Sequence, residues 1–167
     1  MGCLGLHFAL DAEAVHELKG IADETERRDY VREDLEVKYF GDYPEWLAQT
    51  DKAWDAIHRA LTDGKLGWDN GDYPLNHVIL GGELLYTADD YIMTLKTPAQ
   101  VREISAALRD LTENDFRKNY HAIDADNHGF PVGAEDFDYT WCLFQPLREF
   151  YDRAATAGRY VLFTADQ

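Results

Sequence analysis

Residues 91–111 read YIMTLKTPAQVREISAALRDL and contain a strand signal followed directly by a helix signal. Residues 91–95 form an apolar run rich in the branched and aromatic side chains that strands favour. Thr97-Pro98-Ala99-Gln100 then forms a capping box with proline at the first helical position. Apolar side chains at helical spacing continue the helix to Leu111. This stretch therefore predicts a strand that leads straight into an amphipathic helix.

Further strands are predicted near both ends of the sequence. Residues 4–9 form a short apolar run, and residues 159–163 follow a helix stop at Gly158. We expect these two strands to lie in the same sheet. Helical patterns fill most of the sequence between the strands. The helix over 135–157 must be kinked or divided at Pro146, because proline removes a backbone donor and clashes with the preceding turn.

This order of elements predicts an α+β fold over a single domain, residues 1–167. We expect a small mixed sheet of roughly three or four short strands with about five helices packed on it. One of these helices ends at Leu61 and is predicted to be capped by Thr50 or Asp51. The densely charged segment 22–36 is predicted to be a solvated surface helix.

The charge of the chain excludes two classes of partner. The sequence has 32 acidic residues against 16 Lys and Arg, which gives a formal net charge of −16. An acidic surface repels phosphate backbones and anionic lipid headgroups, so we expect neither nucleic-acid binding nor membrane binding. Hydrophobic residues make up 46% of the sequence, which is enough to form a core and excludes general disorder.

A cytoplasmic location is predicted from the lack of targeting signals. The first basic residue is Lys19, and His7 interrupts the short apolar run near the N-terminus, so the pattern of a secretory signal is absent. No stretch has the roughly 18 apolar residues that a membrane span requires. Cys3 and Cys142 are far apart in sequence and lie among apolar neighbours, so we expect two buried free thiols rather than a disulfide.

Several segments together resemble the YfbM-like family of small bacterial proteins, a domain of unknown function. The matching segments are MGCLGLHFALDAE at 1–13, KAWDAIH at 52–58, LTDG at 61–64, PLNHVILGG at 74–82 and FYDRAA at 150–155. Segments 22–42 and 122–138 match less closely. The resemblance implies an α+β single domain in a cytosolic bacterial protein with no established activity. It implies no catalytic residues, so any chemistry must be argued from this sequence.

The common enzyme motifs are missing from the sequence. There is no phosphate-binding loop, no dinucleotide fingerprint and no nucleophile elbow. Ser105 lies in the middle of a predicted helix among charged neighbours, and so acidic a chain offers little cationic surrounding to activate a cysteine thiol. Nucleophilic catalysis is therefore disfavoured.

The sequence from Asp124 to Glu135 follows the template of a calcium-binding loop. Asp124, Asp126 and Glu135 occupy ligand positions one, three and twelve, with glycine at position six. Two residues depart from the template: His128 offers nitrogen where a hard cation prefers oxygen, and Pro131 lacks a backbone donor. Two interpretations stay open, a calcium site and a solvated acidic turn, and no other cofactor is expected.

A second group consists of His58, Trp68, Asp69, Asp72 and His77. His58 lies on the inward face of its predicted helix, and the other four lie in or just after a loop rich in glycine. If the loop folds back on the helix, a carboxylate–imidazole pair could serve acid–base chemistry or hold a metal, with Trp68 and His77 binding a ligand. The alternative is that His58 is a core histidine and that the other residues only shape the loop.

Two functions from different classes follow. The favoured hypothesis is a non-enzymatic acidic binding module for a basic protein partner, as an inhibitor or immunity protein would be. Its aromatic anchors would come from a group around a turn, Tyr39, Phe40, Tyr43 and Trp46, unless that group folds onto the core. The alternative is a small acid–base or metal-assisted hydrolase that uses His58 with Asp69 or Asp72.

Overall fold

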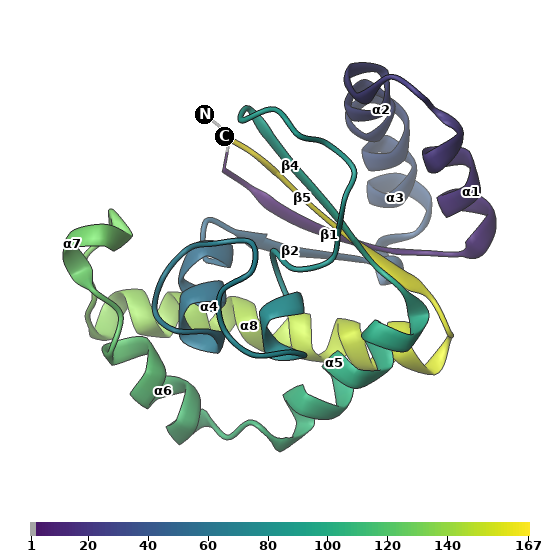
Figure 1. Cartoon of the computed structure of the whole chain (residues 1–167). Coiled ribbons are helices and arrows are strands. Elements are labelled where there is room, and N and C mark those ends of the chain that lie inside the picture. Colours follow the sequence, from purple (N-terminus) through teal and green to yellow (C-terminus); the bar gives the residue numbers. More distant parts are fainter. Residues whose placement is uncertain (1–2) are drawn as a thin grey trace.

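The computed structural model describes residues 3–167 and is built on one five-stranded antiparallel sheet (Figure 1). The strand order is β2-β1-β5-β4-β3, and each pairing is antiparallel. The strands are β1 (Gly5–Leu10), β2 (Leu47–Asp51), β3 (Glu83–Leu84), β4 (Tyr91–Lys96) and β5 (Tyr160–Asp166). The α+β class is confirmed, whereas the expected mixed sheet with fewer strands is wrong.

The strands near the two ends of the chain lie in the same sheet, as predicted, and they form its centre. Gly5 of β1 lies opposite Ala165 of β5, and Leu10 lies opposite Tyr160. Both strands are almost entirely buried. Because helices cover both faces of the sheet, these strands read as continuous apolar runs rather than as alternating patterns.

Strand β2 was missed because its residues were assigned to a helix cap. Thr50 and Asp51 end this strand, and α4 (Trp54–Leu61) begins three residues after Asp51, with Ala53 as an N-cap that makes no side-chain hydrogen bond. Asp51 has a left-handed backbone with φ of 46°. The strand is a half-exposed edge with few β-branched residues, so its local signal is weak.

Three helices cover one face of the sheet (Figure 1). They are α1 (Ala12–Gly20), α2 (Glu24–Tyr30) and α3 (Glu36–Asp42), and a π-helical turn over Val31–Leu35 joins the last two. Asp11 caps α1 through a hydrogen bond from the backbone of Ala14. Val31 and Leu35 are apolar residues of the charged segment 22–36, and both are buried against the sheet.

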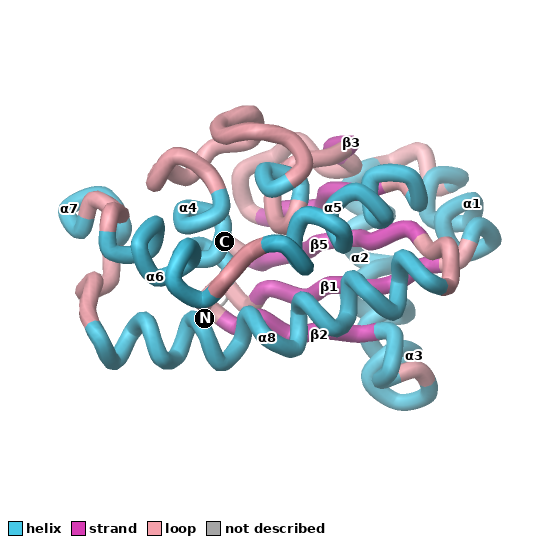
Figure 2. The backbone as a smooth tube through the Cα atoms, turned by 90° about the horizontal axis from the view of Figure 1, so that it is seen from below, coloured by secondary structure: helices cyan, strands magenta, loops and turns pink. Residues whose placement is uncertain are grey.

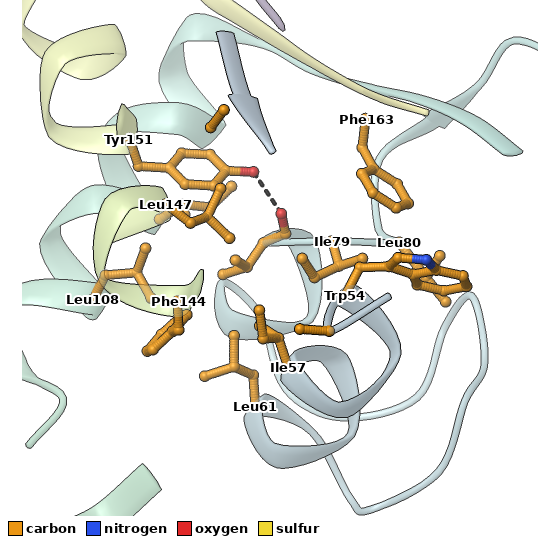
Figure 3. Packing of buried hydrophobic residues seen from close by; sticks show 14 of the residues in the cluster. Trp54, Ile57, Leu61, Ile79, Leu80, Leu108, Phe144, Leu147, Tyr151 and Phe163 are labelled. Carbon is orange, nitrogen blue, oxygen red and sulfur yellow. Dashed lines mark hydrogen bonds between the residues drawn. The ribbon is translucent and has the colours of Figure 1, made fainter. Parts of the chain in front are cut away.

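The other face packs against α4, α5 (Pro98–Asp110) and α8 (Ala134–Thr156), and α6 (Glu113–His121) packs against α4. The predicted capping box of α5 is present in full. Figure 2 shows α8 lying along β1 and β2 and α5 lying along β5. Figure 3 shows the core between these layers, where the Tyr151 hydroxyl donates a 2.6 Å hydrogen bond to the carbonyl of Val78.

Helix α8 continues through Pro146 without being divided. Proline removes only its own backbone donor, and the flanking turns stay packed because Phe144 and Leu147 are fully buried. The helix ends as predicted at Gly158, which has φ of 66°. The amide of Arg159 donates to the carbonyl of Ala154, which completes a Schellman motif.

Both cysteines are free and exposed, so the expectation of buried thiols is wrong. Cys142 lies on α8, but the buried stripe of that helix runs through Phe137, Thr140 and Phe144 and leaves Cys142 on the outer side. Among residues 3–167, no helix is both long and apolar enough to cross a membrane.

Truncation of a side chain in the central strand should destabilise the whole fold. Phe163 is fully buried on β5, so Phe163→Ala should lower the free energy of unfolding by about 3–5 kcal/mol, measured by urea denaturation. Phe40→Ala removes the same ring from a site that is 46% exposed and should change the free energy of unfolding by less than about 0.5 kcal/mol. Similar losses in the two variants would contradict this placement of the core.

Candidate functional site

A cleft of about 300 Å³ opens beside the edge strand β3. The loop that follows α4 forms one wall with Leu66 and Trp68, and β3 with the turn before β4 forms the other with Leu84 and Tyr86. Leu66, Trp68 and Leu84 are 39%, 46% and 46% exposed, respectively, and all three line this one cleft. Large apolar side chains gathered around a hollow are typical of a binding surface.

The cleft has one charged lining residue, the carboxylate of Asp89. Thr87, also in the lining, donates from its backbone and its hydroxyl to the carboxylate of Glu24, which places a second acid beside the rim. The hydroxyl of Tyr86 donates to Asp90 at 2.7 Å, and this bond raises the pKa of Tyr86 and lowers the pKa of Asp90. Arg28 pairs with Asp90 at 2.9 Å, so the cleft is aromatic and apolar with the Asp89 carboxylate in its lining.

The loop that carries Trp68 is held to α4 by Asn70. Its amide oxygen lies 3.0 Å from Nε2 of His58, and its amide nitrogen donates to the side chains of Thr62 and Asp63. A loop residue with several hydrogen bonds to the helix fixes the loop backbone, and Trp68 with it. Asn70 was not among the residues predicted for the site.

The predicted acid–base group is not assembled. His58 is fully buried and bonded to Asn70, and burial lowers its pKa. Asp69 and Asp72 are exposed, and within residues 3–167 neither is a hydrogen-bond partner of His58. His77 is half-buried and lies 2.7 Å from the amide oxygen of Asn76, outside the lining of the cleft. Of the predicted residues, Trp68 is the one that lines the cleft.

The segment from Asp124 to Glu135 is not folded as a calcium loop. The Asp124 carboxylate caps the short helix α7 (Ala125–His128) by accepting from the backbone of Asp126. Glu135 lies in the first turn of α8. Across the part of the chain that the structure describes, no three His, Cys, Asp or Glu side chains are grouped to hold a metal. His128 instead turns inward, to the carboxylate of Asp55.

The aromatic group around the predicted turn is divided by the fold. Tyr39 is the buried residue of α3, whereas Phe40 and Tyr43 are 46% and 41% exposed and Trp46 is half-buried. The ring of Trp46 is covered by the guanidinium of Arg159, 4.0 Å from the ring centre. Only part of this group is therefore available to a partner.

A buried lysine was missed by the sequence analysis. Lys96 ends β4 with no exposed surface and donates hydrogen bonds to the carbonyl of Ile79 and the hydroxyl of Thr94. Burial lowers its pKa well below the ordinary value. Alternation along β4 puts Lys96 on the same face as Ile92, which could have indicated an inward lysine.

The chain resembles proteins whose function is unknown. The family model described as a domain of unknown function (DUF1877) matches residues 1–164. The chain belongs to the DUF1877 family. The crystal structure of YfbM from Escherichia coli, a protein of unknown function, has the same fold as this DUF1877 chain, with a TM-score of 0.63 and 19% identity. The alignment covers 97% of this chain and 99% of YfbM. No curated protein matches.

The buried imidazole of His7 should make stability fall at acid pH. Burial holds the pKa of His7 well below 6.5, so the unfolded chain takes up a proton at this position before the folded state does. Relative to His7→Gln, the wild type should lose about 1.4 kcal/mol of unfolding free energy between about pH 7.5 and 5.5. Urea denaturation at both pH values measures this difference.

The exposed His16 provides the control for this pH dependence. The His16→Gln variant should follow the wild type between the two pH values. If the free energy of unfolding changes equally with pH in His7→Gln and in the wild type, His7 is not the cause of the loss of stability at acid pH.

Proposed function

We propose that this protein is a non-enzymatic binding module that holds a basic segment of a protein partner in the cleft beside β3. One observation carries the proposal: an aromatic and apolar cleft with exposed Leu66, Trp68 and Leu84 has a carboxylate, Asp89, as its one charged lining residue. This lining is complementary to a cationic side chain with an apolar stem.

Arginine and lysine have this chemistry. Their aliphatic stems pack on apolar walls, while the charged group finds an aromatic face and a carboxylate. Trp68, which is 46% exposed, offers aromatic surface, and Asp89 offers the counter-charge. A volume of about 300 Å³ is at the lower end for ligand pockets, so it suits one or two side chains of a docked segment.

The net charge of −16 supports the same class of partner. A strongly acidic protein attracts a basic protein over several ångströms, which raises the association rate at low ionic strength. An inhibitor or immunity protein directed at a basic target would combine such a field with a few exposed aromatic anchors. The acid–base alternative loses its proposed pair, because Asn70 occupies the position expected for Asp69 or Asp72.

Two substitutions in the cleft test the proposal. Tagged wild type, Trp68→Ala and Asp89→Lys are used to capture partners from a lysate of the source organism at about 50 and 500 mM salt, and the affinity of a recovered partner is then measured by calorimetry. The proposal expects a basic partner whose dissociation constant rises at least about tenfold in both variants and rises further with salt.

The control is Asp138→Lys, which makes the same charge change at an exposed position of α8 outside the cleft lining. Its affinity should stay within about threefold of the wild type. Equal binding by wild type and Trp68→Ala, or equal losses in Asp138→Lys and Asp89→Lys, would overturn the assignment of the cleft.

A further inference from the structure

A second, smaller cavity lies where α4, α7 and α8 meet. Its volume is about 130 Å³, and Ala53, Ala56 and Phe130 form apolar parts of its wall. Two polar atoms of lining residues, Nε2 of His128 and Oγ1 of Thr140, are buried without a hydrogen-bond partner within the described residues. The His128 side chain is only 2% exposed. Unpartnered buried polar atoms are rare, and here they point to a ligand.

The orientation of the His128 ring is determined by its other nitrogen. Nδ1 lies 3.0 Å from the Asp55 carboxylate, and Nε of Arg59 donates to the same oxygen at 2.6 Å. A carboxylate paired with a guanidinium accepts hydrogen bonds, so Nδ1 carries the hydrogen. In the neutral ring Nε2 is then an acceptor, and it faces a second carboxylate, that of Asp136.

The distance between these two acceptors suits a bridging donor. Nε2 of His128 is 3.9 Å from Oδ2 of Asp136, which is too long for a direct hydrogen bond. One donor atom placed about 2.9 Å from each would bond to both. Tyr120 donates to the same oxygen of Asp136, which orients the carboxylate toward the cavity. The bridging atom must carry at least two hydrogens, as a water oxygen and an ammonium nitrogen both do, so the surrounding charge decides between them.

The surrounding charge also favours a cation. The groups at the cavity and behind it are three carboxylates and two cationic side chains, which leaves one negative charge when His128 is neutral: Asp51, Asp55 and Asp136 against Lys52 and Arg59. Lys52, the cationic residue of the lining, is exposed to solvent. Phe130 adds an aromatic face to the wall.

We infer that this cavity binds the primary ammonium group of a small molecule, which donates to Nε2 of His128 and to the carboxylate of Asp136. The small volume limits the ligand to an ammonium with a few further heavy atoms. A trimethylated ammonium has the same charge but no N–H donor, so it should not bind. The inference does not depend on the proposed function, because the two sites share no lining residue.

The test uses two matched probes, ethanolamine and choline, titrated into the ¹⁵N-labelled full chain. Ethanolamine should give saturable shifts at the amides of residues 52–56 and 128–140 and at the His128 side-chain nitrogens, whereas choline should give none. In Asp136→Asn the dissociation constant for ethanolamine should rise at least about tenfold. Asp138→Asn, an exposed position on the same helix, should bind like the wild type.

Four results would overturn the inference. They are no saturable shift with ethanolamine, equal shifts with choline, equal weakening in Asp136→Asn and Asp138→Asn, and saturable shifts at the same nuclei with Zn²⁺ but not with ethanolamine. The result with Zn²⁺ would assign His128 and Asp136 to a metal site. The amide spectrum of each variant shows directly whether it is folded. If Asp136→Asn does not fold, His128→Gln takes its place with the same expected loss.

Discussion

The antiparallel pairing of β1 with β5 is the interaction on which the rest of the structure depends. These strands come from opposite ends of the chain and lie side by side over their whole length, from Gly5 opposite Ala165 to Leu10 opposite Tyr160. β2 extends the sheet on one side, and β4 with β3 extends it on the other. Because both faces of this central pair are covered, the two hydrophobic cores are formed on opposite sides of the same two strands.

The core between the sheet and α4, α5 and α8 contains polar groups that bind the turn over residues 78–80. Lys96 donates to the carbonyl of Ile79, and Tyr151 donates to the carbonyl of Val78, so two buried carbonyls outside regular secondary structure are satisfied. Leu80, the next residue, lines the cleft beside β3. A lysine and a tyrosine deep in the core therefore hold one wall of the candidate binding site in place.

The two candidate sites are built in the same way, from loops that histidine contacts hold to α4. In the cleft, His58 binds Asn70 and so positions the loop with Trp68. In the smaller cavity, His128 binds Asp55 and brings α7 against the same helix. A rigid helix with adaptable loops on it is a common arrangement of binding sites. Both sites offer acceptors, carboxylates and aromatic rings, in keeping with the acidity of the chain.

Local sequence was sufficient where an element is set by its own pattern. The Thr97 capping box, the stop at Gly158 and the apolar runs of β1, β4 and β5 are short-range signals, and they predicted the α+β class and the presence of the two end strands in one sheet. Trp68 was singled out in the same way, as an aromatic residue in a flexible loop. Strand β2 was missed because its pairing with β1 comes from residues about forty positions away, and a weak local pattern does not reveal it.

The partners of the chemical groups were decided only by the tertiary structure. His58 is hydrogen-bonded to Asn70 rather than to a nearby aspartate. His128, in the segment that resembles a calcium loop, is hydrogen-bonded to Asp55 of α4. Lys96 is buried and donates to the carbonyl of Ile79. In each case the spacing in sequence allowed several partners. Helix packing and loop closure selected one of them, because a buried polar group requires a hydrogen bond wherever the fold places it.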